Sequence, residues 1–152
     1  MPDWLGLAPR LVTTPARWGR DRIKKRFVDW QALVARGAPI ITEVTEFIRR
    51  AGPVAAAVGT DQQIADRLHQ NDERWEELRP RLLTYGNEHP SDDIQQLTEE
   101  VAERLGRMLG ATIYLSIRSQ GGDVYAAYMD ARNLQDEAAL LAEQLRTKVR
   151  KY

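Results

Sequence analysis

The chain has 152 residues, of which 43 % are hydrophobic and 29 % are charged, a composition typical of a globular protein that buries a core. It contains no cysteine, which excludes disulfides, thiolate metal ligands and a cysteine nucleophile. The net charge is zero, but residues 1–36 carry 8 basic and 3 acidic residues, whereas residues 37–152 carry 14 and 19. Such segregation of charge indicates that the basic segment meets another molecule.

No targeting or membrane segment is expected. The N-terminal residues lack the basic and apolar regions of a secretory signal peptide. The longest uncharged runs are ten residues each, at 51–60 and 108–117, whereas a membrane-spanning helix needs about 20 mostly apolar residues. The expected location is the cytoplasm, with contact at the periphery of a membrane as an open alternative.

The N-terminal 36 residues are predicted to form two parts. Residues 1–15 contain three prolines and one glycine, which predicts an irregular lead-in. Thr14 and Pro15 have the form of an N-cap and a first helical residue, and Gly37 is a typical helix stop. The sequence therefore predicts a separate basic amphipathic helix over residues 16–36, here called the basic arm.

Residues 37–152 are predicted to form one helical bundle domain. Pro39 opens a second helix, the Ala-Gly-Pro sequence at 51–53 interrupts it, and the small apolar residues 54–59 predict one or two buried turns. Thr60 and Gln63 have the form of a capping box, which begins a long third helix.

The second half of this domain contains two more predicted helices. Gly86 is expected to end the third helix, after a kink at Pro80. Ser91 caps a fourth helix that runs to about Arg118. The glycines at 121–122 form a turn, and the last helix starts at Asp123. Residues 111–117 are rich in strand formers, but no partner strand is evident, so helix is expected there as well.

Apolar residues recur at spacings of three and four along the last three helices, as in coiled-coil seams. The three seams are Ile64, Leu68, Asn71, Trp75, Leu78, Leu82 and Tyr85; Ile94, Leu97, Val101, Leu105 and Met108; and Ala127, Ala131, Leu134, Ala138, Leu141, Leu145 and Val149. Short connections make neighbouring helices antiparallel. The predicted fold class is all-α, an antiparallel bundle of three to four long helices with the additional basic N-terminal helix.

The seams also predict the core. The residues expected to be buried are Trp75, Leu78, Leu82, Val101, Leu105, Leu141 and Leu145. Asn71 is the polar member of the first seam. It either fixes register or oligomeric state from a buried position, or faces solvent at the edge of the bundle.

The basic arm combines an apolar stripe with many cations. On a helical wheel Ile23, Phe27, Trp30 and Val34 fall on one side. The opposite side of the helix carries the cations Arg22, Lys25, Arg26 and Arg36. Arg20 and Lys24 flank the apolar stripe, and Trp18 lies outside it. This pattern is typical of a helix that lies in an anionic membrane interface or docks in a groove of a partner protein. The simpler interpretation is a first bundle helix whose stripe faces the core.

Nucleic-acid binding is a further alternative for the basic arm, because cations interleaved with aromatic residues contact phosphate backbones. The isoelectric point is only about 6.8, and residues 61–103 hold 12 acidic residues against 4 basic ones. The sequence also contains no zinc-finger spacing, no RRM signature and no convincing helix-turn-helix. Nucleic acid is therefore not the expected partner.

One group of carboxylates resembles a catalytic motif. Glu99, Glu100 and Glu103 form the pattern E-E-x-x-E, and Asp123 follows three residues after Gln120. This looks like the paired motif of the MazG-type all-α nucleotide pyrophosphatases, E-E-x-x-E followed by E-x-x-D on facing helices. The resemblance implies that Glu99, Glu100, Glu103 and Asp123 hold Mg²⁺, which binds the phosphates of a nucleotide. The chain departs from that pattern because Gln120 stands where the family has Glu.

The expected function is a non-catalytic helical binding or scaffolding module without a cofactor. Residues 18–34 of the basic arm are expected to dock on a partner protein or to mediate self-association, so that the protein forms a homo-oligomer. An Mg²⁺-dependent nucleotide pyrophosphatase is the alternative function, and nucleic-acid binding through the basic arm is the second alternative.

Overall fold

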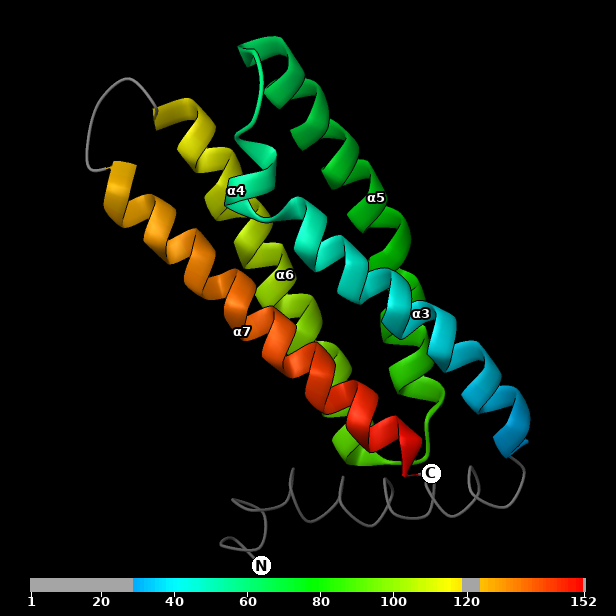
Figure 1. The fold of residues 1–152 in the computed structure, drawn as a ribbon. Helices are drawn as coiled ribbons and strands as arrows, with labels where there is room; N and C mark the ends of the chain where they lie inside the picture. The colour runs from blue at the N-terminus through cyan, green and yellow to red at the C-terminus, as the bar shows by residue number, and fades with distance from the viewer. Residues whose placement is uncertain (1–28, 119–123, 152) are drawn as a thin grey trace, which may run out of the picture.

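The computed structural model describes residues 29–118 and 124–151 of the chain. Its helices are α3 (Trp30–Ala51), α4 (Pro53–Ala56), α5 (Asp61–Glu88), α6 (Asp92–Arg118) and α7 (Val124–Arg150), as Figure 1 shows. The described residues form no strand, and the stretch rich in strand formers at 111–117 is helical. The all-α prediction is confirmed.

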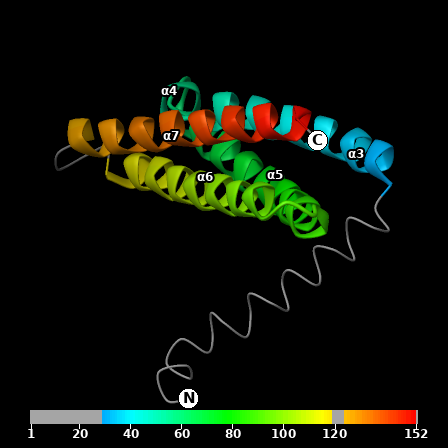
Figure 2. The ribbon, with the colours of Figure 1, turned by 90° about the horizontal axis from the view of Figure 1, so that it is seen from below.

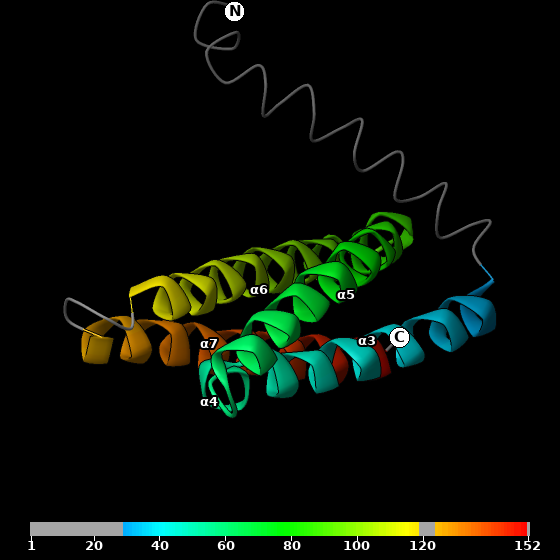
Figure 3. The same ribbon diagram turned by 90° about the horizontal axis from the view of Figure 1, so that it is seen from above.

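The four long helices form an antiparallel bundle. α3 packs against α5 and α7, and α6 packs against the same two helices, most extensively against α7. Figures 2 and 3 show α3 and α7 on one side of the bundle and α5 and α6 on the other. Each long helix is therefore antiparallel to both of its neighbours, in the up-down-up-down order that short connections favour.

The two ends of this bundle differ. At one end, here called the closed end, α3 begins, α5 turns into α6, and α7 finishes (Figure 1). At the opposite end, here called the open end, lie α4, the start of α5, the end of α6 and the start of α7. α5 and α6 converge toward the closed end and diverge toward the open end, as Figures 1 and 3 agree.

The predicted core is confirmed for six of its seven residues. Trp75, Leu78, Leu82, Val101, Leu105 and Leu145 are all buried. Leu141 is half-buried and packs against the edge of the same cluster. The seam pattern therefore identified the buried face of three helices, because residues three and four apart share one side of a helix.

The predicted helix starts at Thr60 and Ser91 are also confirmed. Gln63 N donates to Thr60 Oγ1 at 3.2 Å, and Thr60 N donates to Gln63 Oε1 at 2.9 Å, which completes a capping box. Ser91 precedes α6, and its Oγ accepts from Ile94 N at 3.5 Å. These contacts satisfy backbone N–H groups that lack a partner within the helix.

The predicted helix boundary at Gly37 and Pro39 is wrong, because α3 runs through both residues. Gly37 is buried against Tyr85, and a Cβ atom added there would lie 2.5 Å from Tyr85 Cζ. The glycine therefore permits close packing of two helices rather than a helix stop. Gly86 has a similar position, since α5 continues past it to Glu88, and its missing Cβ leaves space for Thr98.

The basic arm is not one continuous helix. Asp29 has φ −80° and ψ 103°, and its side chain accepts from Gln31 N at 3.0 Å and Ala32 N at 3.2 Å. This N-cap starts a new helix at Trp30, because an N-cap residue is not itself helical. Residues 30–36 of the basic arm thus belong to the first helix of the bundle. The remainder lies outside the described residues, and the division of the chain at 15 stays a prediction.

Candidate binding site

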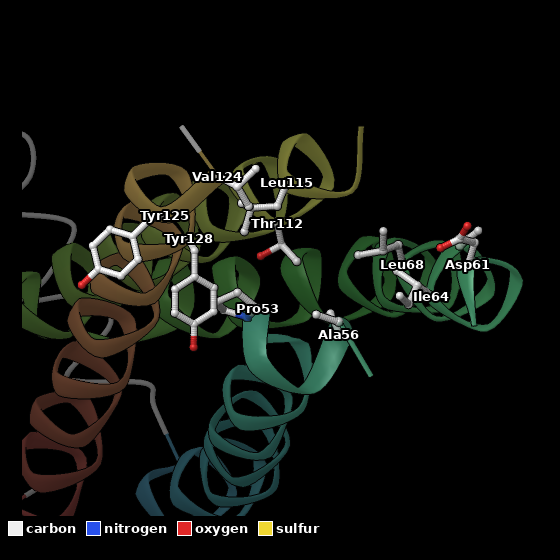
Figure 4. Close-up of a pocket in the computed structure, with 12 residues that line it drawn as sticks. Pro53, Ala56, Asp61, Ile64, Leu68, Thr112, Leu115, Val124, Tyr125 and Tyr128 are labelled. Carbon is white, nitrogen blue, oxygen red and sulfur yellow. The ribbon is translucent and has the colours of Figure 1, made fainter. Parts of the chain in front are cut away.

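The open end contains a cavity of about 780 Å³ between α4, α5, α6 and α7 (Figure 4). Its described lining residues are Pro53, Ala56, Ala57, Asp61, Ile64, Ala65, Leu68, Thr112, Leu115, Val124, Tyr125 and Tyr128. Ligand sites in proteins commonly have volumes of about 300–1,000 Å³ and mostly apolar walls. Size and composition therefore make this cavity the candidate binding site.

The cavity exists because the apolar seam of α5 extends beyond the helices that bury it. Toward the closed end, Trp75, Leu78 and Leu82 are buried between neighbouring helices. Toward the open end, Ile64 and Leu68 continue the same spacing but are only half-buried, and no α5 residue before Trp75 is fully buried. The divergence of α5 from α6 leaves this part of the seam facing the cavity (Figure 4).

Few polar groups face the cavity. Figure 4 shows Tyr125 and Tyr128 of α7 on one side and Asp61 of α5 on the other. The Thr112 hydroxyl is already engaged, since it donates to the Met108 carbonyl at 2.8 Å. Of the described lining residues, only Asp61 carries a formal charge. The walls therefore suit an apolar ligand with a neutral or cationic polar group.

Exposed apolar residues lie around this cavity. In its lining, Tyr125 is 73 % exposed and Val124 is 38 % exposed. Single exposed apolar side chains are ordinary, but a group of them beside an apolar cavity is typical of a binding surface.

One wall of the cavity is formed by α4 and Ala57, and hydrogen bonds from α5 hold α4 in place. Arg67 Nη1 on α5 donates to the carbonyls of Ala55 at 3.1 Å, Ala56 at 3.1 Å and Val58 at 2.7 Å. These carbonyls lie at the C-terminal end of α4, where unpaired backbone acceptors favour a cation. Gly59 follows with a φ of 110°, a left-handed conformation that glycine adopts without strain. The site therefore has a fixed wall rather than an open loop.

The described part of the basic arm is only partly available for binding. Trp30 packs against the core, and its ring meets the His89 ring edge-on at a centroid distance of 6.2 Å. Val34 is 41 % exposed, whereas Leu33 is buried. Trp18, Arg20, Arg22, Ile23, Lys24, Lys25, Arg26 and Phe27 lie outside the described residues.

The described carboxylates of the MazG-like motif are engaged on the surface of α6. Glu103 pairs with Arg104 at 3.0 Å and with Arg107 at 3.7 Å, and Glu100 accepts from Gln96 at 3.2 Å. Glu99 is exposed, and Asp123 lies outside the described residues. Within residues 29–118 and 124–151, no three His, Asp or Glu side chains are grouped closely enough to hold a metal ion.

Sequence reasoning did not identify the cavity. Ile64 and Leu68 were recognised as seam residues, but the seam does not reveal where its partner helix diverges. The available signal was the small apolar stretch 54–59, because so short a segment cannot cover the apolar seam of α5, which runs over about six helical turns from Ile64 to Tyr85.

Comparisons with known proteins give no relative: no family model, no curated protein and no solved structure matches this chain. Among the helices that the structure describes, none has the length and apolar character needed to cross a membrane. The functional argument therefore depends on the geometry of the open end.

Proposed function

We propose that this protein is a non-catalytic helical binding module whose open-end cavity holds an apolar segment of a protein partner. The observation that carries this proposal is the half-buried seam of Ile64 and Leu68, which continues a repeat that is buried from Trp75 to Tyr85. Amphipathic helices commonly bind such grooves through apolar residues at spacings of three and four.

Burial of apolar surface supplies the expected driving force, at about 25 cal/mol for each Å² removed from water. The fixed wall of the cavity supports this proposal, because a preformed site loses little conformational entropy when it binds. Charge has a smaller part at the cavity itself, where Asp61 favours a partner with a cationic group.

The proposal includes the basic arm as a second contact and self-association as one form of binding. Residues 1–36 carry an excess of five positive charges, which favours an anionic protein surface or an anionic membrane surface. The cytoplasm, with contact at the periphery of a membrane, remains the proposed location.

A cavity-filling variant tests the binding site directly. Ala65 lines the cavity and is exposed, so Ala65→Trp should fill it without disturbing the core. The matched control is Ala139→Trp, at an exposed alanine of α7 that does not line the cavity. All three proteins also carry Ile23→Asp and Phe27→Asp, so that the apolar stripe of the basic arm does not compete for the cavity. Titration with the neutral apolar fluorescent probe N-phenyl-1-naphthylamine should show saturable binding to the chain with Ala65 and to the Ala139→Trp control, and much weaker binding to Ala65→Trp.

Circular dichroism should show equal helix content for all three proteins, which excludes partial unfolding as the source of probe binding. Indistinguishable titrations of the chains with Ala65 and with Ala65→Trp, in the same Ile23→Asp/Phe27→Asp background, would argue against the open-end cavity as a binding site.

A further inference from the structure

We propose that the partner in the open-end cavity is residues 16–28 of a second copy of this chain, and that two copies exchange these segments reciprocally. The inference rests on the proposed function, since it names the occupant of the same site. It is carried by three observations: the apolar pattern of the segment, the charge of α5 and the length of α3.

Residues 16–28 contain apolar side chains with the spacing that the cavity requires. Ile23 and Phe27 are four residues apart, so they share one side when the segment is helical. The cavity offers Ile64 and Leu68, also four residues apart, together with Leu115 of α6 (Figure 4). Two short stripes of equal spacing pack together as neighbouring helices of a bundle do.

The charges of the two surfaces are opposite. Residues 16–28 contain six basic residues and one acidic residue, whereas residues 61–77 of α5 contain six acidic residues and two arginines. Both arginines are engaged: Arg67 binds the carbonyls after and within α4, and Arg74 pairs with Glu77 at 2.9 Å and with Glu43 at 3.7 Å. The first half of α5 thus presents a net negative surface beside the cavity, which attracts and orients a basic segment.

Covalent geometry prevents the segment of the same chain from filling the cavity. α3 separates Trp30 at the closed end from Ala51 near the open end (Figure 1), a length of about 32 Å at 1.5 Å for each residue. Phe27 is two residues from Asp29 and reaches at most about 7 Å from it, and Ile23 reaches at most about 22 Å, even in extended chain. The occupant must therefore come from another molecule.

Reciprocal exchange gives a closed assembly. Two copies that lie side by side in opposite directions place the closed end of one beside the open end of the other. Residues 16–28 of each copy then bind in the cavity of the other copy, and a two-fold axis relates the two identical contacts. The basic arm and the cavity of each molecule are both used, so association stops at the dimer.

Sedimentation velocity on the full chain tests this dimer. The wild type should be dimeric at micromolar concentration, and the doubly substituted chain Ile23→Asp/Phe27→Asp should be monomeric. Ala65→Trp, and separately Tyr125→Arg at an exposed position of the cavity wall, should also shift the protein toward monomer. Each change should raise the dissociation constant by about 30-fold or more, as expected for residues at the centre of an interface. Ala139→Trp should remain dimeric.

Complementation provides the decisive result. The Ile23→Asp/Phe27→Asp chain keeps an intact cavity, and the Ala65→Trp chain keeps an intact segment 16–28. An equimolar mixture of these two monomers should form a heterodimer with one docked segment, weaker than the wild-type dimer. High salt should weaken every dimer, because exposed charges are screened.

Three results would overturn the inference: a monomeric wild type, a dimer that survives the Ile23→Asp/Phe27→Asp change, or no heterodimer in the mixture. A monomeric wild type whose segment 16–28 binds anionic vesicles would instead identify a membrane surface as its partner. If the cavity still binds the apolar probe in any of these cases, only this inference fails, and the proposed function stands.

Discussion

The closed and open ends of the bundle use the same helical repeat with different results. At the closed end Tyr85 meets His89 edge-on at a centroid distance of 5.9 Å, and Gly37 allows the Tyr85 ring to contact α3 closely. At the open end Leu68 occupies an equivalent seam position but borders a cavity of about 780 Å³. The difference shows that the spacing of helices, more than the apolar repeat, decides whether a seam is buried as core or stays half-buried beside a cavity.

The largest contrast is expected when one leucine is truncated at each end. Leu82→Ala should lower the free energy of unfolding by about 2–5 kcal/mol, because it leaves a cavity in a closely packed core. Leu68→Ala should cost only about 1 kcal/mol, because its side chain already borders open space. Urea denaturation at neutral pH measures both values.

Equal losses at the two positions would remove the distinction between the ends. The proposed dimer would complicate this comparison, since a bound partner stabilises the folded state. Both variants should therefore be measured in the Ile23→Asp/Phe27→Asp background, where the cavity is expected to be empty.

The next effect is expected where α3 and α5 come closest. Gly37→Ala places a methyl group against the buried Tyr85 ring, at 2.5 Å from its Cζ and Oη atoms. Overpacking of this kind commonly costs about 1–3 kcal/mol. Ala35→Gly, at an exposed position of the same helix, is the reverse change and should cost no more than about 1 kcal/mol through helix propensity. A stability of Gly37→Ala equal to that of the wild type would show that the Tyr85 ring moves away freely.

The repeats predicted most of the fold, and the errors occurred at glycine and proline. Leu78, Val101 and Leu145 were identified as core because a 3.6-residue period places such residues on one face. Gly37 was interpreted as a helix stop from its conformational freedom, whereas its small size is what the fold uses. Pro39 is exposed within α3, where the carbonyl that loses its partner has access to water. The close contact of Gly37 with Tyr85 and the exposure of Pro39 both depend on how α3 packs against other helices. The sequence around each residue therefore does not reveal them.

The binding site was less predictable than the fold for a related reason. Sequence reasoning placed the binding role in the basic arm, and this stays a prediction, because most of the arm lies outside the described residues. In the described part, Trp30 packs against the core and Asp29 is the N-cap of α3. The cavity residues Ala65 and Tyr125 are ordinary in sequence. They line a cavity only because α5 diverges from α6. The angle between these two helices depends on all the contacts that each of them makes, so it cannot be predicted from a local sequence pattern.

A smaller and stabilising effect is expected at Asn71, the polar member of the α5 seam. Its Nδ2 atom is buried and has no hydrogen-bond partner among the described residues. An unpaired buried donor is costly, so Asn71→Leu should raise the free energy of unfolding by about 1 kcal/mol. Asn71→Asp keeps the size of the side chain and should not stabilise. A change of oligomeric state in Asn71→Leu, seen by sedimentation, would instead assign this residue to control of assembly.

The smallest effect at neutral pH is expected at Tyr85, which is buried without a hydrogen-bond partner for its hydroxyl among the described residues. Tyr85→Phe removes that unpaired group, so the variant should be as stable as the wild type or more stable by up to about 1 kcal/mol. Burial raises the pKa of the Tyr85 phenol above its ordinary value of about 10, and the Arg36 guanidinium opposes the rise only in part.

This raised pKa predicts how the difference changes with pH. Above pH of about 10 the unfolded chain releases the Tyr85 proton while the folded protein retains it, so the wild type loses stability as the pH rises. Tyr85→Phe lacks this loss, and its advantage in urea denaturation should therefore grow between pH 8 and roughly pH 11. A constant difference between wild type and Tyr85→Phe across this range would mean that the phenol is as accessible to water in the folded closed end as in the unfolded chain.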